Sequence, residues 1–186
     1  MGFEEIYDTN FAADLTVIEE SKEFLERLES GENLPLFTSC CPGWVKFCEN
    51  KYPEFRKNIS TCRSPQQMFG ALLKEDGRMR TDDNRKTVVV SIMPCSAKKE
   101  EKDRNDNDVD IVLTTVELAD IIKLFGISFK DLEDEKFDTD LLGDFSGAGV
   151  IFGTSGGVME AALRTAYHAL TGKEHEAIKF EAVRGM

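Results

Sequence analysis

Several common features are absent from this sequence, and each absence excludes a class of protein. There is no Cys-x-x-Cys pair and there are only two histidines, so a zinc ribbon is not expected. The 23 lysines and arginines stand against 35 acidic residues, for a formal net charge of -12. This balance argues against nucleic acid or anionic membranes as partners. No apolar run approaches the length of a membrane span, so the sequence predicts no spanning segment.

The five cysteines do not form a disulfide framework. An odd number of cysteines in a chain without an export signal argues against paired thiols. The first residues, Met1–Glu5, contain neither a basic region nor an apolar signal core. We therefore predict a cytoplasmic protein whose spread-out thiols suit iron–sulfur ligation better than disulfides.

Two adjacent cysteines lie in the stretch Thr38–Trp44. The apolar run Leu34–Phe37 predicts a buried strand leading into it, and Pro42 suits the first position of a following helix. A helix N-terminus lowers the pKa of a nearby thiol. Adjacent thiols point in different directions, so one can bind a metal while the other does separate chemistry. The alternative is that both are small buried apolar side chains.

A third cysteine follows a second predicted strand. Thr87–Ile92 is rich in β-branched residues and runs directly into Met93–Glu101, which contains Cys95. Ligand sites in open α/β sheets gather at the carboxyl ends of the strands. We therefore predict that the two cysteine turns share one site.

The remaining pattern alternates between strands and helices, which predicts an α/β fold with a largely parallel sheet flanked by helices. The further predicted helices are Phe11–Leu28, one beginning at Ser64-Pro65, Thr114–Phe125 and Val158–Leu170. The further predicted strands are Asp110–Leu113, Gly149–Phe152 and Ala177–Val183. The glycine-rich turn Gly153–Gly157 lacks the lysine of a phosphate-binding loop, so we interpret it as a point of close backbone approach to a bulky bound group.

One face of the first predicted helix carries a set of charges. Glu20, Glu23 and Arg27 are spaced by three and four residues, so they lie on the same face. From composition alone this favours a solvated, salt-bridged face.

The two cysteine stretches resemble the first two signature motifs of the catalytic domain of [FeFe]-hydrogenases. Thr38–Trp44 matches the family's TSCCPGW motif throughout, and Met93–Glu101 fits its MPCxxKxxE motif. The family's third motif, with two more cysteines, does not occur in these 186 residues. The resemblance implies a single partial domain over residues 1–186, the first half of the catalytic domain, with a leading helix over 1–33 and an α/β core over 34–186.

The resemblance also implies a cofactor, the H-cluster, in which a [4Fe–4S] cubane is joined to a two-iron subsite. The implied cubane ligands are Cys41 and Cys95. Cys40 is the implied proton donor to the subsite. The implied route outward from it runs through Glu23, Ser60, Glu20 and Arg27. The residues implied to surround the two-iron subsite are Lys98, which would hydrogen-bond a cyanide ligand, and Gln66, Met93 and Phe152. Cys48 and Cys62 match no ligand and are predicted to be packed thiols.

The implied activity of the parent protein is the reversible conversion of protons and electrons to dihydrogen. The expected electron carrier is ferredoxin or an NAD(P)-linked redox subunit. Because two cubane ligands are missing, the isolated chain is predicted to be inactive. The alternative is a cytosolic iron–sulfur assembly scaffold. Such relatives share the fold but generally lack the adjacent pair Cys40-Cys41 and the proton route, both of which are present here.

Overall fold

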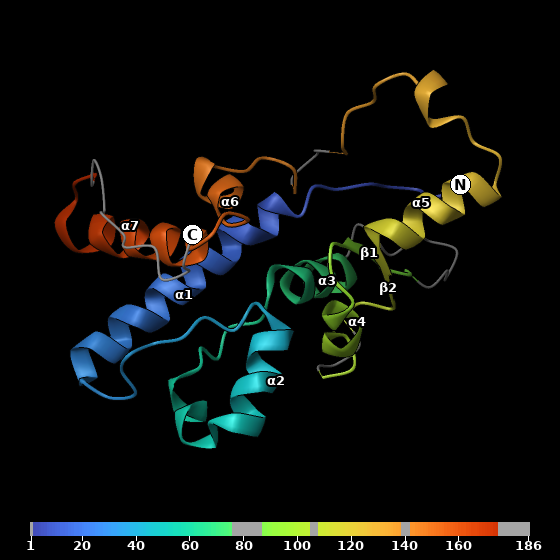
Figure 1. Cartoon of the computed structure of the whole chain (residues 1–186). Coiled ribbons are helices and arrows are strands. Elements are labelled where there is room, and N and C mark those ends of the chain that lie inside the picture. The colour runs from blue at the N-terminus through green and yellow to red at the C-terminus, as the bar shows by residue number, and fades with distance from the viewer. Residues whose placement is uncertain (1, 76–86, 105–107, 139–141, 175–186) are drawn as a thin grey trace.

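The computed structural model describes residues 2–75, 87–104, 108–138 and 142–174, and it combines helices with a small parallel sheet (Figure 1). The predicted strand Ala177–Val183 lies outside the described residues. The α-helices are α1 (Asn10–Ser30), α2 (Pro42–Lys51), α3 (Pro65–Glu75), α4 (Ala97–Glu101), α5 (Thr115–Leu124), α6 (Gly147–Ile151) and α7 (Gly157–Thr171). Two 3-10 turns are η1 (Pro53–Asn58) and η3 (Phe129–Asp131).

The sheet pairs β1 (Val90–Met93) with β2 (Ile111–Thr114) in parallel, with Val90 opposite Ile111 and Met93 opposite Thr114. This confirms the prediction of a mixed α/β fold with parallel strands. Both strands end at the same edge, where α4 and α5 begin shortly afterwards. A small valine core lies beside the sheet and is completed by partly buried neighbours. Its members are Val89, Val109 and Val112, with Leu73 and Met93 packed against them.

Two helices begin where local sequence signals place them. Pro65 is the first residue of α3, as predicted from the Ser64-Pro65 pair. Thr114 caps α5 in a complete capping box: its hydroxyl accepts from the Glu117 N–H, and the Glu117 carboxylate accepts from the Thr114 N–H at 2.8 Å. These starts are decided within one turn of chain, which explains why sequence reasoning found them.

Helix α1 is a central element that packs against α3, α6 and α7 (Figure 1). The predicted helix is confirmed, but its buried face leaves out the large apolar residues Ile18 and Leu28, which are 55% and 49% exposed. The buried residues are small or polar instead: Ala12, Ala13, Thr16, Val17, Glu20 and Ser21. Short side chains let the helix backbones approach closely, and the Ser21 hydroxyl donates to the Ala162 carbonyl of α7 at 3.0 Å.

Two predicted strands are wrong. The segment predicted as strand Gly149–Phe152 belongs mainly to helix α6, which Ser146 caps by accepting from the Ala148 N–H at 3.1 Å. A short apolar run cannot be assigned to strand or helix by periodicity alone, and here the cap decides. Leu34–Phe37 forms no strand, and only Phe37 makes an isolated parallel bridge, to Ile59. That bridge nevertheless fixes the chain just before the cysteine pair.

The outer helix α5 has no buried residue, although it is rich in apolar side chains. Leu124 is 83% exposed and Phe125 is 66% exposed.

Within the described ranges, no helix is both long and apolar enough to cross a membrane.

Candidate functional site

The structure brings the two cysteine turns close to each other. Cys41 caps α2, and its sulfur accepts from the Trp44 N–H at 3.4 Å. Cys95 follows the end of β1, and Lys98 then reaches back to donate from Nζ to the Cys40 carbonyl at 2.7 Å. A Cβ placed on Gly43 would lie 3.9 Å from both the Cys41 sulfur and the Ala97 Cβ. The predicted juxtaposition of these two turns at the carboxyl edge of the sheet therefore agrees with the geometry.

The thiols of Cys41 and Cys95 are both exposed, which suits ligands that face a bound group rather than packed side chains. Two thiolates can supply half of the four ligands that a cubane cluster normally takes. Within the described part of the chain, no group of three or more histidine, cysteine or acidic side chains is arranged to hold a metal. The donors present thus fit part of an iron–sulfur site.

A buried carboxylate, that of Glu101, organises the lysine beside the cysteines. It pairs with Lys98 at 2.8 Å and accepts from the Ser64 hydroxyl at 2.9 Å and from the Gln66 amide at 3.1 Å. The other end of the Gln66 side chain accepts from the Ser91 hydroxyl at 2.9 Å. Lys98 and Gln66 are therefore held by protein contacts. Glu101 matches a position of the second motif, but its contacts with Ser64 and Gln66 could not be read from spacing.

Glu23 lies in a chain of polar contacts that also includes Ser60 and Arg27. It accepts from the Ser60 hydroxyl at 2.8 Å, from the Thr61 N–H at 3.0 Å and from the Arg27 guanidinium. The Glu23 and Arg27 side chains are only 13% and 11% exposed. The predicted salt bridge on this face is therefore confirmed, but the face is not solvated, because both charged side chains are largely buried.

Glu20 lies deeper than Glu23 and is 1% exposed. Its Oε1 accepts from the Ser39 N–H at 3.4 Å, whereas Oε2 has no partner among the described residues. Burial raises the pKa of this carboxyl, against the opposing effect of hydrogen bonds from Ser39 and Ser60. Glu20 is thus a buried acid that can hold a proton more readily than an exposed glutamate.

Cys40 is electrostatically coupled to Glu20. Burial, followed by the charge of Glu20, raises the pKa of the Cys40 thiol to about 11. The expectation that the helix N-terminus lowers the thiol pKa is wrong for Cys40, because this residue precedes the capping residue Cys41, and desolvation together with the charge of Glu20 raises its pKa instead. Cys40 is consequently a protonated thiol at neutral pH in this chain.

These contacts reverse the implied order of the two glutamates. The charge of Glu20 raises the pKa of Cys40, and hydrogen bonding by Ser60 lowers the pKa of both Glu20 and Glu23. The Ser60 hydroxyl donates to Glu23, and Glu23 in turn pairs with Arg27. The order is therefore Cys40, Glu20, Ser60, Glu23 and Arg27, because Glu20 is the acid that acts on Cys40 and Glu23 is the one that Arg27 holds.

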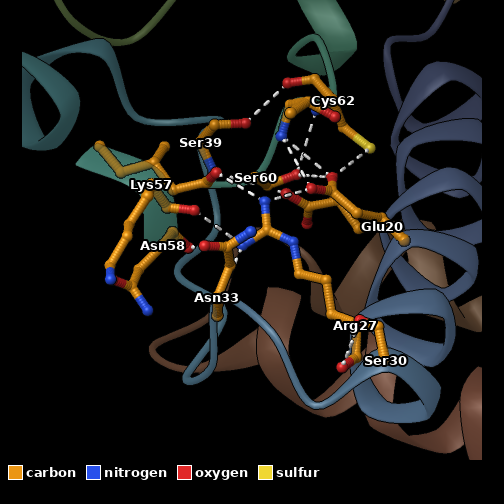
Figure 2. Close-up of polar contacts among 12 residues, drawn as sticks. Glu20, Arg27, Ser30, Asn33, Ser39, Lys57, Asn58, Ser60 and Cys62 are labelled. Carbon is orange, nitrogen blue, oxygen red and sulfur yellow. Dashed lines mark hydrogen bonds and ion pairs between the residues drawn. The ribbon is translucent and has the colours of Figure 1, made fainter. Parts of the chain in front are cut away.

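Arg27 joins the end of α1 to the segment that precedes Ser60 (Figure 2). Besides Glu23, its guanidinium donates to a set of backbone carbonyls at 3.0 to 3.2 Å. They belong to Asn33, Lys57, Asn58 and Ile59. Only a planar fork with several donors can satisfy this many acceptors at once.

Replacing Arg27 by alanine should lower the free energy of unfolding by about 3 kcal/mol, because a largely buried carboxylate loses its counter-charge. Arg27→Lys should recover only part of this loss, since an ammonium cannot span the same carbonyls. Arg164 is a matched control, because it forms an i,i+4 pair with Glu160 on α7 but is 44% exposed. Arg164→Ala should lower the free energy of unfolding by only about 0.5 kcal/mol. Urea denaturation measures both, and equal effects would contradict this account of Arg27.

The remaining predicted site residues lie on other elements. Met93 ends β1 and packs on the valine core, while Phe152 follows α6, which packs against α1. A Cβ on Gly157 would lie 1.7 Å from the Ile151 carbonyl oxygen. This glycine therefore permits close contact between α6 and α7. The interpretation of Gly153–Gly157 as a point of close approach to a bulky bound group stays a prediction. Cys48 is fully buried, as predicted.

Comparison with known proteins agrees with these motifs. The family profile described as "Iron only hydrogenase large subunit, C-terminal domain" matches residues 1–186. The chain belongs to this iron-only hydrogenase family.

Curated relatives include [FeFe]-hydrogenases from several bacteria. The chain is 51% identical to the NADP-reducing hydrogenase subunit HndD of Solidesulfovibrio fructosivorans over 100% of its length and 34% of that protein. It is 50% identical to the periplasmic [Fe] hydrogenase large subunit of Nitratidesulfovibrio vulgaris, over 100% of this chain and 46% of the relative. Identity to the protein NAR1 of Arabidopsis thaliana is 34%, over 99% of this chain and 45% of that protein.

Solved structures of iron-only hydrogenases share this fold. The apo [FeFe]-hydrogenase HydA1 from Chlamydomonas reinhardtii superposes with a TM-score of 0.81 at 45% identity, covering 100% of this chain and 48% of that one. The iron-only hydrogenase chain described here therefore spans about half the length of the solved proteins it resembles, and less than half of the curated relatives above.

Proposed function

We propose that this chain forms the proton-delivering half of the catalytic site in an active [FeFe]-hydrogenase, which converts protons and electrons reversibly to dihydrogen. The observation that carries the proposal is the connected set of side chains from Cys40 through Glu20, Ser60 and Glu23 to Arg27. Each member can hold, pass or electrostatically bias a proton. Their burial gives the proton a path separated from bulk water.

Cys41 and Cys95 would provide two ligands of the H-cluster, the group that would supply the redox chemistry when bound. Lys98, held by Glu101 and the Cys40 carbonyl, would present its ammonium to an anionic ligand of that group. Gln66, Met93 and Phe152 remain proposed neighbours of the two-iron subsite.

The electron carrier is proposed to be ferredoxin or an NAD(P)-linked redox subunit. Similarity to a relative named as NADP-reducing supports an NAD(P)-linked carrier. A cytoplasmic location stays a prediction, and one relative is named as periplasmic.

The alternative function is an iron–sulfur assembly scaffold. It is supported by 34% identity to NAR1 of Arabidopsis thaliana and to cytosolic iron–sulfur assembly component 3 of the mouse. The higher identity to hydrogenases, together with the connected acids next to Cys40, supports the enzyme. Hydrogen evolution by the matured protein that contains this chain decides between them: dihydrogen from reduced carrier supports the enzyme, and its absence at full iron loading supports the scaffold.

We expect the 186-residue chain alone to bind iron weakly and to show no hydrogenase activity, because the proposed ligands it supplies are two thiolates of the four that a cubane needs. Anaerobic reconstitution with iron and sulfide, followed by iron counting and a hydrogen assay, measures this. Cys41→Ser should remove most of the residual iron, whereas Cys48→Ser is a matched control at a packed thiol. A stable cubane at full stoichiometry would contradict the expectation.

A further inference from the structure

Cys62 lies in the chain of polar contacts although it matches no family ligand. Its sulfur is 3.4 Å from Glu23 Oε2, the same oxygen that accepts from the Ser60 hydroxyl (Figure 2). The Cys62 N–H donates to Ser60 Oγ at 3.1 Å, and its carbonyl accepts from the Ser39 hydroxyl at 2.6 Å. The backbone on both sides of the thiol is therefore held by hydrogen bonds.

The direction of each hydrogen bond follows from these contacts. Ser60 Oγ accepts from the Cys62 N–H, so its own proton is available to Glu23 Oε2. Burial raises the pKa of the Cys62 thiol to about 12, so this thiol keeps its proton across the neutral range. An ionised carboxylate only accepts hydrogen bonds, and Cys62 must therefore be the donor to Glu23.

We propose that Cys62 is a positioning residue whose thiol, together with the Ser60 hydroxyl, holds Glu23 Oε2 in line for proton transfer. This inference rests on the proposed proton-delivery function and adds a member to it. Glu23 Oε1 is held separately by Arg27. Without the thiol, Oε2 keeps the Ser60 hydroxyl and the Thr61 N–H but loses the donor on its Cys62 side.

The charged and titratable groups around Glu23 are Arg27 and Glu20 from α1 and Cys62 from the facing chain. Burial opposes ionisation of Glu23, yet hydrogen bonds from Ser60, Arg27 and Thr61 lower its pKa below the usual value. Loss of the hydrogen bond from Cys62 would destabilise the ionised Glu23 carboxylate. The titration midpoint of Glu23 should therefore move to higher pH when the thiol is removed.

The test compares Cys62→Ala and Cys62→Ser in the matured hydrogenase that contains this chain. Infrared difference titration follows the Glu23 carboxylate, assigned by its loss in Glu23→Gln, and the pH profile of hydrogen evolution is measured in parallel. Cys62→Ala should raise the proton affinity of Glu23 about threefold, the size of a weak hydrogen bond. The acidic limb of the pH profile of hydrogen evolution should move to higher pH by the same amount. Cys62→Ser should restore both, because a hydroxyl also donates.

If Cys62 only supported the fold, its replacement would act even without Glu23, and a double variant tests this. In the Glu23→Gln background, Cys62→Ala should have no further effect on the pH profile. The proposal is overturned if the carboxylate midpoint does not move in Cys62→Ala, if serine fails to restore it, or if the effect persists without Glu23. The infrared midpoint reports the thiol–carboxylate contact even if proton delivery uses another route, so failure of the proposed function remains distinguishable.

Discussion

Replacing Cys40 by serine in the matured hydrogenase should reduce hydrogen turnover by about 100- to 10,000-fold while iron content stays unchanged, the range expected when a positioned proton donor is lost. Cys40 is only partly exposed, the charge of Glu20 raises the pKa of its thiol, and it is not a metal ligand in this proposal. A serine hydroxyl has nearly the same size but is a much weaker acid, so the geometry persists while proton transfer fails. Hydrogen evolution per iron measures the effect.

The adjacent residue provides the contrast. Cys41 caps α2 and exposes its sulfur, so Cys41→Ser should lower iron content itself. Cys48→Ser alters a packed thiol away from both roles and controls for general damage. Equal iron loss in the Cys40 and Cys41 variants would refute the division of labour between the two thiols. Near-normal turnover in Cys40→Ser would show that protons enter elsewhere.

Replacing Glu20 by glutamine should abolish most turnover and yet stabilise the fold at neutral pH. Glu20 is 1% exposed and has an oxygen without a partner among the described residues, so its ionised form is costly. An amide has the same shape but no charge. We expect a gain in the free energy of unfolding of about 1 to 2 kcal/mol at pH 7, the typical penalty of an unsatisfied buried group.

The raised pKa of Glu20 determines at which pH values Glu20→Gln stabilises the fold. Burial raises the folded-state pKa of Glu20 above its unfolded value. At pH values between these two pKa values, the folded protein therefore binds more protons than the unfolded chain. Its unfolding free energy therefore falls as pH rises through that window and stays lowest above the folded pKa. The advantage of Glu20→Gln should be present at neutral pH and disappear below the ordinary glutamate pKa.

Glu19→Gln is the matched control for this comparison, because the neighbouring side chain is exposed on the same helix. It should change neither turnover nor the pH dependence of urea denaturation. A loss of stability in Glu20→Gln at neutral pH would show that the carboxylate is held by contacts stronger than those seen here. Unchanged turnover would remove Glu20 from the proton path.

The sequence by itself determined the features that depend on a few neighbouring residues. The capping box of Thr114 and Glu117, the start of α3 at Pro65 and the two cysteine motifs are all short-range patterns. The alternation of elements was also enough to predict parallel pairing, now seen between β1 and β2. The capping box and the start of α3 are set by hydrogen bonds or backbone angles within about one turn of chain.

Only the tertiary structure decided which side chains lose water and which of them meet. Spacing placed Glu20 and Glu23 on one face of α1 but could not show that Ser60, far along the chain, lies between them or that Glu20 is the one beside Cys40. The contact of Cys62 with Glu23 joins positions 39 residues apart. Burial and such pairings arise from the packing of distant segments, which is why the order of residues in the proposed proton path required the folded chain.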